Sequence, residues 1–370
     1  MKILQVITSL QIGGAERLVT QMAIAMTEMG HTVDVCVFNG EETIFTKELH
    51  EKGIKVIGFG TSVYNPLYIL KLAKLMRNYD IVHTHNSSPQ LFVAIASMIA
   101  RTGLCTTEHN TSNRKRNWKW YAPIESWMYG RYDHAVCISK IAEDKLREYL
   151  GGKWVCPGSD IYNKVTTINN GVDVNAKYRA EADRELTELK GNRKAIVMIA
   201  GFRQQKDQDT VVRAMSLLDK EQFEVWFAGI GVRENEVRKL AEETGVKDRV
   251  RFLGLRSDVP NVLKAADIVV MSSHWEGLSL SNVEGMSAGK PFVASDVNGL
   301  REVTKGYGLM FPHGDSNALA DIIIKLATDK NYATNITKRC MEQALKYDIR
   351  NMLEQYEIVY RKIIANGKNK

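Results

Sequence analysis

Segments with the hydrophobic patterns of strands and of helices alternate along the whole 370-residue chain. Strands joined through helices are typical of a parallel sheet covered by helices on both faces, because each parallel connection must cross the sheet. The pattern therefore predicts an α/β chain built from doubly wound sheets. We expect strands at residues 2–10, 32–38, 55–59, 81–85, 104–107, 135–138, 165–168, 195–200, 224–228, 250–253, 268–271 and 291–294.

The alternation is interrupted once, by a polar and charged stretch between Gly171 and Arg193 that is poor in strand-forming residues. We expect the interdomain linker at about 173–192, with one Rossmann-like domain at 1–172 and a second at 193–350. A length of 370 residues suits two domains of ordinary size. Two such domains in tandem would place a cleft between the carboxyl edges of their sheets. A last helix at about 351–370 fits either domain, including a return to pack on the first.

Composition narrows the class of protein. Lysine and arginine outnumber aspartate and glutamate by 50 to 43, a formal charge of +7. This charge suits nucleic acid, an anionic membrane surface or phosphorylated small molecules as partners. The five cysteines are odd in number and include no C-x-x-C pair, so we expect neither a disulfide framework nor a structural zinc site. No segment has the pattern of a signal peptide or a membrane span, so we expect a cytoplasmic protein with at most peripheral membrane contact.

Two glycines, Gly13 and Gly14, stand between the first expected strand and a helix expected at 15–29. Glycine lets a backbone approach a ligand closely, and the first N–H groups of a helix attract anions. A tight turn without a ligand explains the glycines equally well. The G-x-G-x-x-G fingerprint of dinucleotide-binding proteins is absent.

A pair of cations follows the first strand of the second domain. Arg203 and Lys206 lie three residues apart after Gly201, at a strand end where open α/β sheets bind ligands. One charge pair in contact is worth about 4 kcal/mol at an effective dielectric of 20. The two cations could therefore neutralise a diphosphate as a divalent metal does elsewhere. An exposed charged turn is the alternative.

Two carboxylates, Glu276 and Glu284, bracket a loop of small residues and a helix start. Carboxylates accept hydrogen bonds from sugar hydroxyls, and loop or helix N–H groups suit phosphate. Ser281, three residues before Glu284, also fits a helix capping box, a structural device worth about 1 kcal/mol. Glu276 has no such structural explanation.

Histidines stand at the ends of two expected strands. His109 follows the strand at 104–107 and is expected to face the cleft, although a single histidine is more often structural than catalytic. His83 and His85 alternate at the end of the strand at 81–85. Their spacing could serve a metal ion, but no third ligand stands at a suitable spacing, so we reject a metal site there.

These features, taken in order along the chain, resemble one family. The chain is similar over essentially its whole length to the retaining glycosyltransferases of family 4 with the GT-B architecture, in which two Rossmann-like domains face each other. The glutamate pair followed by Gly-x-Pro is the most specific motif. The resemblance is carried by Gly13-Gly14-Ala15-Glu16, Glu108-His109-Asn110, Asn170-Gly171-Val172-Asp173, Arg203 with Lys206, Phe252-Leu253-Gly254, Glu276 with Glu284, and Pro291-Phe292-Val293-Ala294-Ser295-Asp296.

The resemblance implies roles for the matched positions. Arg203 and Lys206 would hold the donor diphosphate and stabilise it as a leaving group. Glu276 and His109 would hold the donor sugar, and Glu284 the ribose hydroxyls. Further donor-binding positions implied are Gly13, Gly14, Gly229, Gly231, Leu253, Gly254, Gly277, Leu278, Ser279, Leu280, Asn298 and Gly299. Many members have glycine at position 279 and proline at position 281, where this chain has serines; we expect little loss at either.

The reaction implied is transfer of a hexose-type sugar from a UDP- or GDP-linked donor to a lipid-linked, polysaccharide or oligosaccharide acceptor in bacterial cell-surface glycan biosynthesis. Retention would follow from front-face substitution in which the departing diphosphate takes the acceptor's proton. No D-x-D motif stands out, so we expect neither a metal nor another cofactor. A nucleotide-sugar epimerase of the same architecture is the first alternative, and a basic nucleic-acid-binding protein a less favoured one.

Two basic segments with aromatic or apolar residues lie in the first domain. One runs from Leu67 to Arg77, and the other from Arg114 to Tyr121 with four cations, three aromatics and no acid. Such segments suit an anionic bilayer surface or, less well here, nucleic acid. The alternative is a solvated helix face with tryptophans packed in the core. We favour a membrane surface or a lipid-diphosphate acceptor and do not expect nucleic acid as a partner.

Overall fold

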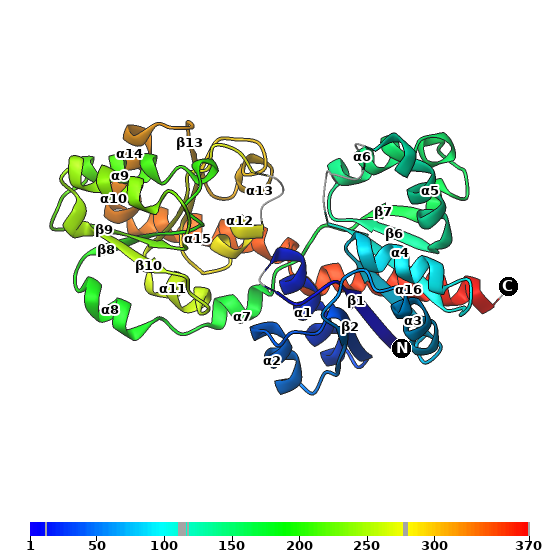
Figure 1. Cartoon of the computed structure of the whole chain (residues 1–370). Coiled ribbons are helices and arrows are strands. Elements are labelled where there is room, and N and C mark those ends of the chain that lie inside the picture. The colour runs from blue at the N-terminus through cyan, green and yellow to red at the C-terminus, as the bar shows by residue number, and fades with distance from the viewer. Residues whose placement is uncertain (12, 110–115, 117, 277–279, 369–370) are drawn as a thin grey trace. The chain divides into compact units, whose positions relative to one another are not determined.

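The computed structural model describes the chain except for residues 12, 110–115, 117, 277–279 and 369–370. The described chain forms two compact units (Figure 1), residues 1–170 with 349–370 and residues 171–348. Each unit contains a parallel sheet with helices packed on it, so the fold is α/β, as the alternating pattern predicted.

In the described part of the first unit, seven parallel strands are ordered β3-β2-β1-β4-β5-β6-β7. The strands are β1 Lys2–Ile7, β2 Thr32–Asn39, β3 Val56–Gly60, β4 Ile81–His85, β5 Gly103–Glu108, β6 His134–Cys137 and β7 Val165–Thr167. The helices are α1 Gly14–Glu28, α2 Ile44–Glu51, α3 Leu67–Met76, α4 Ser87–Ala96, α5 Ala122–Arg131, α6 Lys140–Leu150 and α16 Ile349–Lys368.

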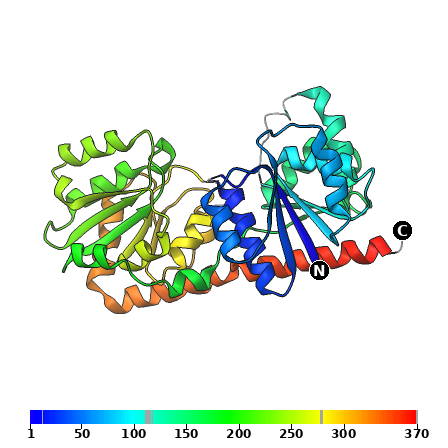
Figure 2. The same cartoon turned by 60° about the horizontal axis from the view of Figure 1, so that its bottom comes forward.

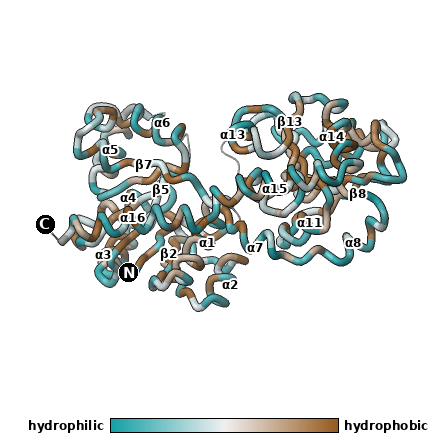
Figure 3. The backbone as a smooth tube through the Cα atoms, turned by 180° about the vertical axis from the view of Figure 1, so that it is seen from behind, coloured by the Kyte–Doolittle hydropathy of each residue, from teal (hydrophilic) through white to brown (hydrophobic). Residues whose placement is uncertain are grey.

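Successive residues of the central strands enter two different hydrophobic cores, one on each face of this sheet. Ile3 belongs to one core and Leu4 to the other. This explains the uninterrupted apolar runs, since both faces need hydrophobic side chains. Figure 3 shows hydrophobic and hydrophilic stretches alternating along the helices that cover the sheets.

The last helix, α16, belongs to the first unit. Its side chains Leu353, Tyr356 and Tyr360 are fully buried in the same core as Ile3. It packs against α1 and β5, and Figure 2 shows it in red along the first unit. Of the two options left open by the sequence, the structure shows packing on the first unit.

In the described part of the second unit, six parallel strands are ordered β10-β9-β8-β11-β12-β13. The strands are β8 Lys194–Ile199, β9 Phe223–Ala228, β10 Val250–Gly254, β11 Ile268–Met271, β12 Phe292–Ser295 and β13 Leu309–Phe311. The helices are α7 Val174–Arg179, α8 Arg184–Lys190, α9 Gln208–Leu217, α10 Glu234–Glu243, α11 Val259–Ala265, α12 Leu280–Met286, α13 Arg301–Thr304, α14 Ser316–Thr328 and α15 Lys330–Lys346. Strand β13 was not among the expected strands.

The expected linker at 173–192 instead contains α7 and α8 and belongs to the second unit. Asp173 caps α7 by accepting a hydrogen bond from the Ala176 N–H at 2.9 Å, and Asp183 caps α8 through the Leu186 N–H at 3.0 Å. Both helices pack on α11. The charged residues that resembled a linker are therefore caps and exposed faces of short helices.

Each sheet reverses its strand order once. In the first sheet the chain proceeds from β1 outward to β3 and then returns to β4 on the other side of β1; the second sheet repeats this at β8 and β11. Ligands of open parallel sheets bind at the carboxyl ends of the strands flanking such a switch point. Glu276 follows β11 and Lys206 follows β8, whereas Gly13 follows β1 and His85 ends β4.

Candidate active site

A lysine and a glutamate meet at the switch point of the second sheet. The Lys206 ammonium donates to Oε1 of Glu276 at 2.5 Å, and both side chains are mostly buried. Ser273 donates to the same carboxylate oxygen at 2.6 Å, and the Gln205 amide donates to the other at 3.2 Å. Three donors from the loops after β8 and β11 therefore hold the Glu276 carboxylate in one orientation. The structure thus brings together two residues predicted from the sequence to be catalytic.

Arg203 occupies the other end of the same turn. It precedes the 3-10 turn Gln204–Lys206, has extended backbone angles and is exposed. Within the described part of the chain, its guanidinium has no hydrogen bond or ion pair, so all five of its N–H donors remain available to a ligand.

Glu284 lies on α12 and pairs with a lysine that sequence reasoning missed. The carboxylate is 3.0 Å from Nζ of Lys177, whose side chain is only 4% exposed. Ser281 lies inside α12, which begins at Leu280, so the capping-box explanation of Glu284 is wrong. Lys177 on α7 comes from the stretch expected to be a linker, and nothing in its spacing from Glu284 signals the pair.

Two glycines in the second unit permit close backbone contacts. A Cβ at Gly229 would lie 2.2 Å from the carbonyl oxygen of Ala200, and one at Gly231 would lie 2.4 Å from that of Phe202. Gly229 also donates its N–H to the carbonyl of Gly254 at 2.8 Å. Close packing between the loops after β8, β9 and β10 therefore explains both glycines. This explanation holds whether or not Gly229 and Gly231 also border a nucleobase.

The loop after β12 supports Glu276 from the other side. The backbone carbonyl of Asn298 accepts from the Glu276 N–H at 3.3 Å. Gly299 has φ +86, and its N–H donates to Glu302 at 2.5 Å. Leu253 is partly buried near Gly254, which has φ +65. Leu280 is the first residue of α12; Gly277, Leu278 and Ser279 lie outside the described residues.

In the first unit, the glycine pair begins α1. Gly13 is its N-cap residue, with φ −167, an extended conformation open to any residue, and Gly14 is exposed. A Cβ at Gly14 would meet nothing within 4 Å. Packing therefore does not explain the glycine at position 14. Close approach of a ligand to the backbone is the explanation that remains.

His109 forms part of a chain of buried hydrogen bonds. Its Nε2 is 2.9 Å from Nδ1 of His85, and Nε2 of His85 is 2.8 Å from Oε1 of Gln5. A carbonyl oxygen can only accept, so His85 carries its hydrogen on Nε2. Burial lowers the pKa of His85 well below its usual range and that of His109 to about 4, so both rings are neutral near pH 7.

The hydrogen-bond chain decides which nitrogen of His109 faces a ligand. Since neutral His85 has its hydrogen on Nε2, its Nδ1 must accept, and His109 must donate from Nε2. Nδ1 of His109 is then an acceptor, and within the described residues it has no partner. Such an atom can accept a hydrogen bond from a substrate hydroxyl.

His83 belongs to a separate group of hydrogen bonds that ties α16 to the sheet. Its ring nitrogens lie 2.7 Å from the Tyr360 hydroxyl and 2.7 Å from Thr107 Oγ1. The Tyr356 hydroxyl is 3.0 Å from the same threonine. Both nitrogens of His83 are thus used in structural hydrogen bonds.

The basic segment from Arg114 to Tyr121 divides into a buried and an exposed part. Arg116 donates to Glu108 at 2.6 Å, and its side chain is 9% exposed. This cation is therefore structural and is not part of a basic surface. Trp118 and Trp120 are 44% and 65% exposed, with rings stacked at 5.6 Å. The alternative of tryptophans packed in the core is wrong; Arg114 and Lys115 lie outside the described residues.

Helix α3 exposes apolar side chains as well. Leu67 and Leu70 are 63% and 62% exposed. Lys71 lies 5.5 Å from the ring centres of Phe59 and Tyr68 and donates to the carbonyl of Phe59 at 3.3 Å. Across the described residues, no helix is both long enough and apolar enough to cross a membrane.

Two doubly wound units in one chain, each with polar residues at the switch point of its sheet, have the GT-B fold. The model of "Glycosyl transferases group 1" matches residues 180–347, and that of "Glycosyltransferase Family 4" matches residues 12–176. The two matches together span most of the chain and leave β1 and α16 of the first unit outside. The chain belongs to this glycosyltransferase family.

Relatives agree with this assignment, and a solved structure shares the fold. The chain is 29% identical over 300 residues to the putative glycosyltransferase EpsD of Bacillus subtilis, covering 76% of each chain. It is 24% identical to the Escherichia coli UDP-Gal:alpha-D-GlcNAc-diphosphoundecaprenol alpha-1,3-galactosyltransferase, covering 80% of each. The structure of Anabaena HepE in complex with UDP superposes with a TM-score of 0.78 at 21% identity, covering 98% of this chain and 100% of that one.

Proposed function

We propose that this protein is a retaining hexosyltransferase that uses a UDP- or GDP-linked sugar and a lipid-linked or glycan acceptor in bacterial cell-surface glycan biosynthesis. The observation that carries the proposal is the Lys206–Glu276 pair at the switch point of the second sheet. It places a cation suited to phosphate one hydrogen bond away from a carboxylate suited to sugar hydroxyls. The Escherichia coli relative is named for a UDP-galactose donor and a lipid-diphosphate acceptor, and the structural neighbour was solved with UDP; both support the same chemistry.

The leaving group is stabilised by Lys206 and Arg203. An ammonium has three N–H donors, so Lys206 can keep its bond to Glu276 and still donate to a diphosphate oxygen. Arg203 adds a planar fork of donors from the exposed end of the same turn. Because negative charge grows on the diphosphate as the glycosidic bond breaks, these cations bind the transition state more tightly than the ground state.

Retention follows when the acceptor attacks from the face that the diphosphate leaves. The bond from the anomeric carbon to the diphosphate oxygen breaks, the bond to the acceptor oxygen forms, and the departing diphosphate takes the acceptor's proton. No protein base is needed in this path. We assign no role to a metal ion or other cofactor in the transfer.

Sugar recognition is assigned to Glu276, Glu284 and His109. The carboxylate of Glu276 has lone pairs beyond those used by Lys206, Ser273 and Gln205. Glu284, held by Lys177, suits the ribose diol. Nδ1 of His109 accepts from a substrate hydroxyl, as its tautomer requires. The glycine and loop positions named above for donor binding remain part of this proposal.

The first unit would meet the lipid part of the acceptor through exposed Trp118, Trp120, Leu67 and Leu70. Amphipathic aromatic rings are favoured at the interface between lipid and water. Sedimentation with vesicles containing anionic lipid tests this surface. Replacing both tryptophans with alanine should reduce binding, whereas Trp275→Ala, which removes an equally exposed tryptophan from the second unit, should not. Equal sedimentation of all three proteins would refute the assignment.

A transfer assay tests the function itself. With a labelled donor and a polyprenyl-diphosphate sugar acceptor, we expect an acceptor-dependent product of retained anomeric configuration. Lys206→Ala should lower turnover by about 10²–10³-fold and affect donor affinity less. Lys239→Ala is the control, because Lys239 pairs with Glu243 on the surface of the same unit at 3.6 Å. Epimerised free donor without any acceptor requirement would identify an epimerase instead.

A further inference from the structure

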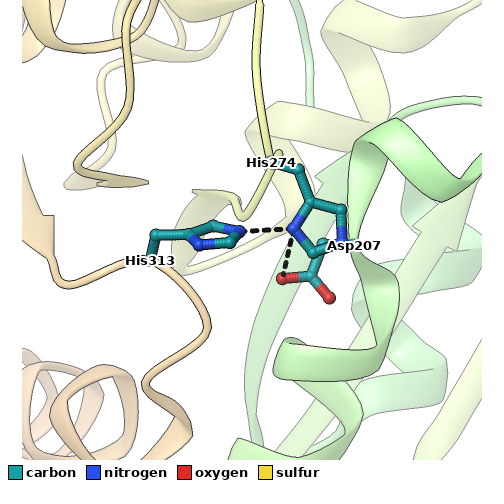
Figure 4. A group of neighbouring side chains, drawn as sticks. All are labelled: Asp207, His274 and His313. Atoms are coloured by element: carbon teal, nitrogen blue, oxygen red, sulfur yellow. Dashed lines mark hydrogen bonds and ion pairs between the residues drawn. The ribbon is translucent and has the colours of Figure 1, made fainter.

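Three potential metal ligands converge at the carboxyl edge of the second sheet. Asp207 follows the 3-10 turn after β8, His274 follows β11, and His313 follows β13 (Figure 4). One ligand atom from each lies within 4.8 Å of the other two. Nδ1 of His274 contacts Nε2 of His313 and is 3.8 Å from Oδ2 of Asp207. The three residues are far apart in sequence, so no local spacing pattern predicts the cluster.

The fold holds two of these ligands in place. Asp207 is 4% exposed and caps α9, accepting from the Thr210 N–H at 3.2 Å and from its hydroxyl at 2.6 Å. A carboxylate has about four acceptor sites, so Oδ2 retains capacity for another ligand. The backbone N–H of His274 donates to the Gln205 carbonyl at 2.8 Å, which fixes its loop. His313 is exposed and free to adjust its rotamer.

The donor set selects a class of ion. We propose that Asp207, His274 and His313 bind a divalent transition-metal ion of the zinc type, with solvent in the fourth position. Two imidazole nitrogens and one carboxylate suit zinc, cobalt or nickel, whereas magnesium and calcium prefer oxygen ligands. Zinc bonds its ligands at about 2.0–2.2 Å, so small rotations of the three side chains suffice to bring their donor atoms onto one ion.

The proposed ion has a structural role that does not depend on the sugar-transfer proposal. Lys206 directly precedes Asp207, and Glu276 follows His274 by two residues. Neither is a ligand. A bound ion restrains the two loops that carry the Lys206–Glu276 pair and joins them to the loop after β13. It takes no part in the transfer itself.

Cobalt absorption provides the test, because tetrahedral Co²⁺ with nitrogen and oxygen ligands absorbs visible light. Full-length protein, freed of metal with a chelator, is titrated with Co²⁺ and then with Zn²⁺ in competition with a chromophoric chelator. We expect one equivalent of Co²⁺ to bind, visible bands to appear, and Zn²⁺ to displace it and raise the melting temperature.

Variants locate the site. His313→Ala removes an exposed ligand, and Asp207→Asn keeps a residue able to cap α9 while removing the negative charge. Each should weaken Zn²⁺ binding by about tenfold or more, the range known for loss of even indirect supports of a metal site. His50→Ala, which removes an exposed histidine of α2, should bind like the wild type. Absence of Co²⁺ bands and of stabilisation, or unchanged affinity in His313→Ala, would overturn the proposal.

Discussion

Replacing Gly231 with alanine perturbs the loop that carries Arg203 without touching a charged group. The added Cβ would lie 2.4 Å from the carbonyl oxygen of Phe202, whereas real Cβ contacts essentially never fall below 3.0 Å. The obstacle is backbone, so the loop itself must move. Phe202 also accepts from the Arg233 N–H and donates to the Ile230 carbonyl, both at 3.2 Å. The substitution therefore strains two backbone hydrogen bonds next to Arg203.

The expected cost follows from overpacking. Forcing an extra methyl into a filled site costs about 1–3 kcal/mol. For a unit of this size, each kcal/mol lowers the melting temperature by about 2–4 °C. Donor nucleotide should also bind more weakly, because Arg203 moves with the loop. Thermal melting, urea unfolding and nucleotide titration measure these effects.

A matched glycine serves as the control. Gly130 lies in α5, and a Cβ there would meet nothing within 4 Å. Gly130→Ala should leave stability unchanged or raise it by about 0.4–1 kcal/mol. If Gly231→Ala melts with the wild type and binds nucleotide equally well, the backbone contact does not position Arg203 as argued.

Three further predictions concern buried polar groups. Burial lowers the pKa of His83 to about 3 and that of His109 to about 4. In the unfolded chain both histidines bind a proton near pH 6.5, so the free energy of unfolding should fall by about 1.4 kcal/mol per pH unit for each histidine as the pH drops from about 6.5 towards 4. Urea unfolding that gives the same stability at pH 7 and pH 5 would contradict this. Nitrogen NMR should find His109 protonated on Nε2 in the wild type and lose that preference in His85→Leu; a wild-type hydrogen on Nδ1 would refute the tautomer argument. Lys177→Met should lower the free energy of unfolding by about 1–3 kcal/mol, because it leaves the Glu284 carboxylate without its lysine. Adding Glu284→Gln to this variant should restore part of the lost stability in thermal melts. Strictly additive losses in the double variant would show that the pair contributes nothing.

Much of the fold was predictable because buried parallel strands produce long apolar runs. Strand β4 matches the expected strand at 81–85, and β11 that at 268–271. Strand β13 was missed because Leu309–Phe311 is only three residues long and has no β-branched residue, whereas the equally short β7 is β-branched at every position. The helices at 174–190 were missed because short capped helices share the polar composition of linkers.

Local motifs identified candidate site residues, but not their long-range partners. Arg203, Lys206 and Glu276 could be selected because strand ends and small-residue loops mark ligand sites in α/β sheets. Lys177, the partner of Glu284, and Gln5, the partner of His85, were not predictable, because those contacts join residues 107 and 80 positions apart. The capping-box error at Ser281 had a different cause: the spacing fitted, but a capping serine must precede its helix, and α12 already includes Ser281.

Nucleotide binding tests the central claim most directly. A panel of UDP- and GDP-sugars, with the free nucleotides, is screened for a rise in melting temperature and for slow hydrolysis of the donor. A ligand at 100 times its dissociation constant stabilises by about 2.7 kcal/mol, which for a unit of this size is a rise of about 5–10 °C. We predict such a rise with at least one nucleotide sugar, and a smaller one in Lys206→Ala than in Lys239→Ala. No shift with any nucleotide diphosphate or nucleotide sugar, or equal shifts in both variants, would contradict the account.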